Sequence, residues 1–274
     1  MVKEYSRPAA DKKLNLKIIR PFSTLKSTID YLLNLLAIYK KDEEWSQVYS
    51  FVSDRFRAIR HDLIVQDLEP QLIVSLLEPM IPFYLEAKKR CEQLKTNSYN
   101  KKLHSSELTE CFSRWISAAK KGAKVDENLI LAYGYFYLDK NETPEELFHV
   151  FGFNDLTNQL AENWIDYYNG NYCKIFQLYN ELDSNVLRAA LLPHIGLLRF
   201  RILEDFRIVF GIRGLVFEVE DLVKILDFKS KETVEKCLKD VFKIEGKFPS
   251  PFSFANLIVR QFDKTNLQFY WFED

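Results

Sequence analysis

Apolar residues recur at intervals of three and four along most of this chain, which is the pattern of amphipathic helices. The first helix follows Pro21, with Ser23 or Thr24 as its cap. The second is expected to begin at a cap residue, Asp42, and to run to about residue 68, where Pro70 ends it. Further helices are expected at about 70–95, 106–120, 126–139, 155–169, 171–182 and 184–209.

The connections between these helices are short and polar. The helix over 70–95 is expected to bend near Pro79 and Pro82, and residues 96–105 form the best candidate loop. Short connections between amphipathic helices favour antiparallel neighbours stacked as hairpins. We therefore predict an all-α fold, a helical-hairpin superhelical array like those of TPR and HEAT proteins. No repeat of fixed length supports a regular tetratricopeptide array.

The sequence pattern changes after Gly211. A short helix over 219–226, a tight turn and a second helix over 231–242 capped by Ser230 are followed by two expected strands, 243–248 and 252–262. Two short helices and a terminal hairpin predict a winged helix. An array followed by a winged helix resembles the architecture of PCI domains. The expected division is an extended leader at 1–21, a helical array at 22–210 and a winged-helix domain at 211–274.

Composition narrows the function classes. The chain has 274 residues, of which 47% are hydrophobic, and its formal net charge of -1 gives no overall field that would attract nucleic acid or an anionic membrane. Any nucleic-acid contact must come from a local patch. The cysteines lie too far apart for zinc or redox motifs, so buried, reduced thiols in a reducing compartment are expected. They are Cys91, Cys111, Cys173 and Cys237.

Neither secretion nor a membrane is expected. The first residues carry no apolar segment of the kind found in secretory leaders. The longest apolar run, 129–138, has about half of the length that a bilayer demands.

The second helix carries the most distinctive polar pattern. Arg55, Asp62 and Gln66 share one face, and Arg57 and Arg60 lie on a neighbouring strip. We interpret these residues as a partly buried network that fixes the packing of adjacent helices through charge-assisted hydrogen bonds. Direct contact with a partner is the alternative. The full set is Asp54, Arg55, Arg57, Arg60, Asp62 and Gln66.

A catalytic interpretation would make Asp54 or Asp62 a general base assisted by His61. Because His61 and Asp62 are adjacent, they are expected on different faces, and the sequence offers no nucleophile motif to complete a site. Glycine-rich phosphate-binding patterns are lacking as well. We therefore expect no enzymatic activity, no cofactor and no bound metal.

Several stretches resemble one family. The segment from Phe51 to Gln66 is similar to a helix of the form F-x-x-D-R-x-R-x-x-R-x-D-x-x-x-Q, which is typical of the SAC/GANP family. Other stretches of the chain resemble the family's opening signature and a later helical pair. They are Tyr5-Ser6-Arg7-Pro8-Ala9-Ala10, Arg20-Pro21, Leu25-x-x-Thr28-x-x-Tyr31-Leu32, Ala161-x-x-Trp164, Gly170-Asn171-Tyr172 and Phe176.

This resemblance implies a scaffold subunit that is not an enzyme. In the family, the winged helix pairs with a PCI-domain protein of the Thp/PCID type, itself held by a small acidic DSS/Sem-type protein. That assembly, the TREX-two complex, couples transcription to mRNA export at the nuclear pore. A short SAC-domain protein of the cytoplasm, acting at the centrosome or spindle, is the alternative. The family's upstream Cys-Pro element is missing, so an excised domain and a short member both stay open.

The winged helix supplies the candidate nucleic-acid surface, for RNA or DNA. In the family, the two paired winged helices together present a basic surface. Glu232, Glu235 and Asp240 lie between the lysines, so a merely solvated face is the alternative. The candidate contacts are Lys231, Lys236, Lys239, Lys243, Lys247 and Arg260.

Aromatic residues near the end are too many for a free tail. Some are expected to close the winged helix and the others to form the partner interface. The candidates are Phe248, Phe252, Phe254, Phe269 and Trp271.

Overall fold

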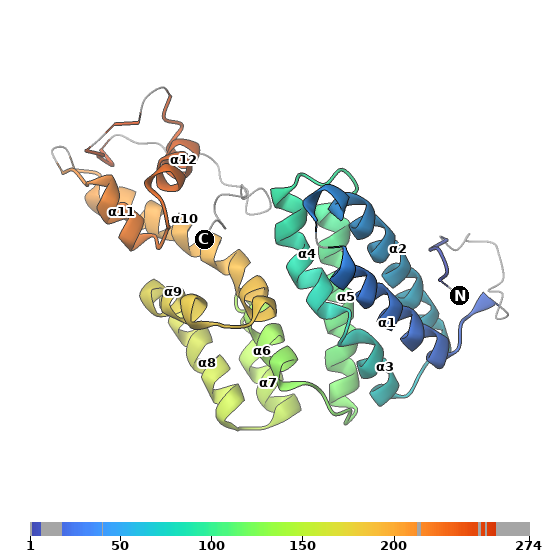
Figure 1. Ribbon diagram of the computed structural model, residues 1–274. Helices are drawn as coiled ribbons and strands as arrows, with labels where there is room; N and C mark the ends of the chain where they lie inside the picture. Colours follow the sequence, from blue (N-terminus) through green and yellow to red (C-terminus); the bar gives the residue numbers. More distant parts are fainter. Residues whose placement is uncertain are drawn as a thin grey trace, which may run out of the picture. The chain divides into compact units, whose positions relative to one another are not determined.

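A computed structural model of the chain describes residues 2–6, 18–39, 41–212, 215–245, 248–249 and 251–255 (Figure 1). This described part is all-helical, as predicted, and contains no β-strand. The chain divides into two compact units, residues 1–133 and residues 134–274. The expected boundary between residues 210 and 211 stays a prediction.

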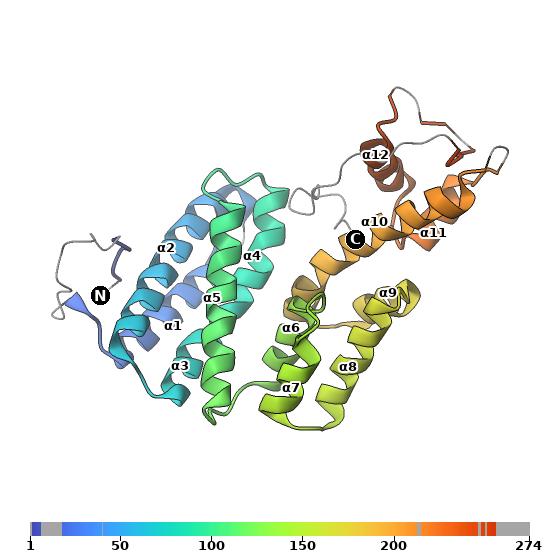
Figure 2. The same ribbon diagram turned by 180° about the vertical axis from the view of Figure 1, so that it is seen from behind.

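The first unit contains α1 (Phe22–Ile38), α2 (Asp42–Gln66), α3 (Pro70–Leu77), α4 (Ile81–Gln93) and α5 (Lys101–Lys120). Helix α1 packs against α2 and α3, and α5 packs against α3 and α4 (Figures 1 and 2). The core between them is rich in large side chains with almost no exposure. It includes Leu25, Phe56, Tyr84, Phe112 and Trp115.

Some helix ends in this unit differ from the predictions. Pro21 precedes α1, and no side chain caps that helix, so neither Ser23 nor Thr24 has the expected role. Asp42 is the first helical residue of α2 rather than its cap. The expected bend near the two prolines is a full break between α3 and α4. Helix α5 begins within the expected loop, because the side chain of Asn100 accepts a hydrogen bond from the backbone N–H of residue 103.

Helix α6 (Glu127–Phe136) contains the division between the units, since the second unit begins at Gly134. The second unit then holds α7 (Thr143–Phe151), α8 (Asp155–Tyr168), α9 (Tyr172–Glu181), α10 (Asn185–Phe210), α11 (Val219–Ile225) and α12 (Lys231–Phe242). Each helix from α7 to α10 packs against the next one along the chain, and α11 packs against α12. Helix α7 was not expected from the sequence, although Thr143-Pro144 is a typical start of a helix.

Close packing in the second unit depends on one small residue. A Cβ atom on Gly134 of α6 would lie 2.6 Å from Cδ2 of Leu160 in α8. Only glycine therefore lets these two helices approach as closely as they do.

The cysteines mostly follow the prediction. Cys91, Cys111 and Cys237 are buried free thiols, whereas Cys173 is exposed, contrary to expectation. The pKa of the Cys111 thiol is raised to about 12, chiefly by burial, so it behaves as a small apolar group. Among the helices that the structure describes, none is both long and apolar enough to cross a bilayer.

The region after α10 pairs differently from the expected hairpin. Phe217, just before α11, forms an isolated antiparallel bridge with Phe252, with N···O distances of 2.7 and 2.8 Å. The strands expected at 243–248 and 252–262 are not formed where the structure describes these residues, and part of both ranges lies outside the described residues. The complete hairpin stays a prediction.

Candidate functional site

Arg60 ties α2 to α5. Its guanidinium is almost fully buried, with Nη2 at 3.0 Å from Oε1 of Glu107 and Nη1 at 2.9 Å from Oε2 of Glu110. Nη1 also donates to the backbone carbonyl of Glu107 at 3.1 Å. Arg57, one turn earlier, reaches the same Glu107 carboxylate at 3.5 Å. Two arginines of α2 therefore converge on one buried acid of α5.

The electrostatics of Glu107 follow from its surroundings. Burial raises the pKa of this carboxyl, and the charges of Arg60 and Arg57 oppose that rise. Burial outweighs the two arginines, so the pKa stays above its usual range. Ionised Glu107 therefore depends on its arginine partners.

Asp62 ties α2 to the start of the chain. Its side chain has no exposed area, and its oxygens lie 2.7 Å from Nε of Arg20 and 2.9 Å from Nζ of Lys3. Burial favours the neutral acid, but the hydrogen bonds from Arg20 and Lys3 outweigh burial and lower the pKa. Gln66, one turn later, donates to the backbone carbonyls of Arg20 and Asp62, each at 2.9 Å.

Residues 2–6 continue this contact along α2. The backbone N–H of Tyr5 donates to Oδ2 of Asp54 at 3.1 Å, and the guanidinium of Arg57 lies 4.2 Å from the centre of the Tyr5 ring. Arg55 differs from the expected network, because it pairs with its neighbour Asp54 and covers the ring of Phe51 at 4.5 Å. Arg55 therefore shields its own helix and does not brace a neighbouring one.

These charged groups hold neighbouring segments of the first unit together. His61 and Asp62 are not on separate faces as expected, because His61 Nδ1 lies 3.8 Å from Asp62 Oδ1. Asp62 is nonetheless enclosed by cations and has no exposed surface from which to act on a substrate. Across the described residues, no group of three or more His, Cys, Asp or Glu side chains could hold a metal ion.

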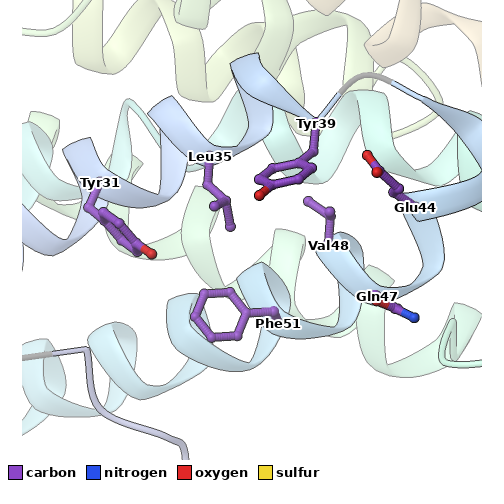
Figure 3. A pocket seen from close by; sticks show the side chains of 7 residues that line it. All are labelled: Tyr31, Leu35, Tyr39, Glu44, Gln47, Val48 and Phe51. Carbon is purple, nitrogen blue, oxygen red and sulfur yellow. The ribbon is translucent and has the colours of Figure 1, made fainter.

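A shallow groove of about 490 Å³ runs between α1 and α2 on the surface of the first unit. Figure 3 shows that its lining is mainly aromatic and aliphatic, with the carboxylate of Glu44 at one end. A mainly apolar lining with a few polar groups is typical of binding sites. The lining residues are Tyr31, Leu35, Tyr39, Glu44, Gln47, Val48 and Phe51.

The structure describes four of the six candidate nucleic-acid contacts, and their joining into one surface stays a prediction. Lys236 and Lys239 lie three residues apart on the outer side of α12, and the exposed Lys243 follows the helix end. Lys231 instead pairs with Glu220 of α11 at 2.8 Å, which joins the two short helices. Lys247 and Arg260 lie outside the described residues.

The predicted aromatic interface is wrong for three residues. Phe248, Phe252 and Phe254 are buried, because they pack into an aromatic cluster that includes Phe217 at 5.4 Å and Phe242 at 5.8 Å from the Phe254 ring. These rings are core. Phe269 and Trp271 lie outside the described residues.

The exposed apolar surface of this region lies elsewhere, at the end of α10 and before α11. Its residues are between 39% and 69% exposed: Ile208, Val209, Ile212, Leu215 and Val216. We name these five residues the α10 patch. The sequence did not single out this patch, since an adjacent apolar pair of the same helix, Ile202 and Leu203, is buried.

Arg199 of α10 positions the two short helices. Its side chain is fully buried, Nε donates to the carbonyl of Leu226 at 2.8 Å, and a terminal nitrogen donates to the carbonyl of Asp227. Its guanidinium lies 3.9 Å from the centre of the Phe228 ring. Because Leu226 and Asp227 end α11, Arg199 satisfies carbonyls that the helix leaves without partners.

The fold and these contacts define an all-helical protein in which buried charge pairs brace neighbouring helices. Residues 1–245 match the model of the SAC3/GANP family, and the chain belongs to that family. SAC3 family protein B of Arabidopsis thaliana is 37% identical over 100 residues, covering 36% of this chain and 6% of that protein. Protein xmas of Drosophila melanogaster is 24% identical over 231 residues, covering 78% of this chain and 11% of that protein. The chain thus spans a small part of the length of these relatives. Membership of the family fits a scaffold role in mRNA export.

Proposed function

We propose that this chain is a non-enzymatic scaffold module of nuclear mRNA export that pairs with a PCI-domain protein. The observation that carries the proposal is the α10 patch, because it exposes contiguous aliphatic side chains beside a buried aromatic core. Family membership supports the export role and a nuclear location, at the pore. A small acidic DSS/Sem-type protein would hold the partner.

A winged helix is the proposed form of the pairing module. Helices α11 and α12 form a compact helix–turn–helix, with Ser230 capping α12 through the backbone N–H of Thr233. The bridge from Phe217 to Phe252 supports this form, since it joins the segment before the two helices to the segment after them. A solenoid-like stacking of α7 to α10 would carry the module.

The pairing is tested by co-purification with a PCI-domain partner. Ile208→Asp with Ile212→Asp should abolish recovery of the partner, because both side chains are more than two-thirds exposed and charge there leaves the fold intact. Phe153→Asp with Ile165→Asp changes two exposed apolar residues elsewhere in the same unit and is the matched control. Equal recovery with both double variants would exclude the α10 patch as the interface.

The nucleic-acid role is proposed for the paired winged helices. Lys236→Glu with Lys239→Glu should weaken binding of RNA by the heterodimer, since these lysines share the outer side of α12. Lys140→Glu with Lys174→Glu, which makes the same change in net charge, should leave binding nearly unchanged. Unaltered RNA binding by the α12 variant in a gel-shift assay would remove these residues from the surface.

A further inference from the structure

A second basic region lies in the first unit, far along the chain from the winged helix. Between residues 86 and 102 the chain has six basic residues and two acidic ones, Glu86 and Glu92. The matching stretch on α12 alternates lysines with acids and is close to neutral. The basic residues are Lys88, Lys89, Arg90, Lys95, Lys101 and Lys102.

The fold gathers these residues at one end of a helical hairpin. Helices α4 and α5 lie side by side, and a short loop joins the end of α4 to the start of α5 (Figures 1 and 2). The carboxylate of Glu92 lies 3.6 Å from Nζ of Lys101, so the two helix ends are in direct contact. Lys95 and Lys102 are exposed and Lys89 is half-buried, and none of the three has an ion-pair partner within the described ranges.

This concentration of positive charge works against stability. Lys101 and Lys102 occupy the first turn of α5, where the helix dipole is positive, and that turn itself contains no acidic residue. The pKa of the Lys88 amine is lowered by burial, an effect that Glu92 opposes and the charge of Lys101 reinforces. Positive charges at a helix N-terminus lower the stability of the helix, and a bound anionic ligand would offset that loss.

We propose that the α4–α5 corner, formed by Lys88, Lys89, Lys95, Lys101 and Lys102, binds the sugar-phosphate backbone of single-stranded RNA. Lysines on flexible stems contact successive phosphates without reading the bases. These residues are different from those proposed for the winged-helix surface.

The side chains of the corner can bind phosphates as point charges. The planar fork of arginine binds carboxylates and phosphates alike, and the only arginine between residues 86 and 102 is Arg90. Arg90 is engaged with Asp42 at 2.9 Å and with the ring of Trp45 at 4.2 Å. The cations left at the surface are lysines, which act as point charges and suit phosphates.

The test is fluorescence anisotropy of a labelled uridine 20-mer with the full chain alone, at several salt concentrations. The corner variant carries Lys89→Glu, Lys95→Glu and Lys102→Glu. The control carries Lys26→Glu, Lys121→Glu and Lys124→Glu, which are exposed lysines of the same unit and give the same change in net charge. Lys102→Glu also places an acid in the first turn of α5, where it favours the helix, so loss of fold does not explain a loss of binding.

We expect the corner variant to lose about tenfold or more in affinity, and the control to lose less than about threefold. Loss of three phosphate contacts should also reduce the slope of log affinity against log salt by about 2. Equal losses in the two variants, or none in either, would overturn the proposal. So would intact RNA binding by a corner variant that no longer binds poly-glutamate, since the surface would then belong to an acidic protein.

Discussion

Replacing Arg60 by alanine is the most direct test of the brace between α2 and α5. The change removes two hydrogen bonds, to the Glu107 carbonyl and the Glu110 carboxylate, and the ion pair with the Glu107 carboxylate, which stays buried. Removing one partner of a buried ion pair generally costs ~3–5 kcal/mol. Arg57 still lies 3.5 Å from Glu107, and Glu110 is partly exposed to water. We therefore expect Arg60→Ala to lower the free energy of unfolding by about 2–4 kcal/mol.

Urea unfolding followed by circular dichroism measures this loss as a shift of the transition midpoint. The matched control is Arg55→Ala, which removes an arginine from the same helix but breaks only contacts within that helix, with Asp54 and the ring of Phe51. A partly exposed ion pair within one helix contributes about 0–1 kcal/mol. A second test is Arg60→Met with Glu107→Leu, which removes both charges and should recover most of the lost stability.

The stability cost of Arg60→Ala should depend on pH. Burial raises the pKa of Glu107, and Arg60 opposes that rise. In the variant without Arg60, the Glu107 carboxyl therefore keeps its proton to a higher pH. Protonated Glu107 needs no cation. The cost of Arg60→Ala should therefore shrink as the pH falls from about 7.5 towards the ordinary carboxyl value of about 4.5. A cost that is the same at pH 5.5 and 7.5, or one no larger than that of Arg55→Ala, would refute the reasoning.

Three further variants probe other contacts by the same unfolding measurement. Asp62→Asn should lower stability at neutral pH by about 1–3 kcal/mol. Because the native pKa of Asp62 is depressed, the wild type should lose this advantage as the pH falls through that lowered value, and a gap that does not narrow with added acid would contradict it. Arg199→Ala should cost about 2–4 kcal/mol by leaving two carbonyls at the end of α11 without donors, and a melting curve like that of the wild type would exclude this role. Gly134→Ala should cost about 1–3 kcal/mol because its Cβ would lie 2.6 Å from Leu160, and combination with Leu160→Ala should cost less than the sum of the two single changes.

The sequence predicted helices best where short-range signals surround them. Helices α8 to α12 begin and end within a few residues of the expected positions, because caps such as Ser230 act through local hydrogen bonds. The start of α5 was misplaced because residues 96–105 are polar, and polarity alone does not separate a loop from an exposed helical turn. Asn100 carried the missing information as a cap.

The partners of the charged helix could not be predicted from its own pattern. Periodicity identified Arg60 and Asp62 as polar residues of α2, but their partners come from far along the chain. Arg60 donates a hydrogen bond to a residue 47 positions away in the sequence. Asp62 accepts hydrogen bonds from residues that lie 42 and 59 positions away. Only the packing of α5 and of the start of the chain against α2 selects those partners.

Aromatic content failed as a guide to the interface for a physical reason. A phenylalanine has the same hydrophobic gain in a core as in a partner's pocket, so counting rings does not separate the two environments. Residues around Phe254 fill the core because the bridge between Phe217 and Phe252 turns them inwards. The aliphatic α10 patch is left outside, since the buried positions of α10 end at Leu203 and Ile208 and Val209 lie beyond them. The residues that a partner can reach are therefore the apolar residues that the core does not cover. The search for an interface should begin with these residues.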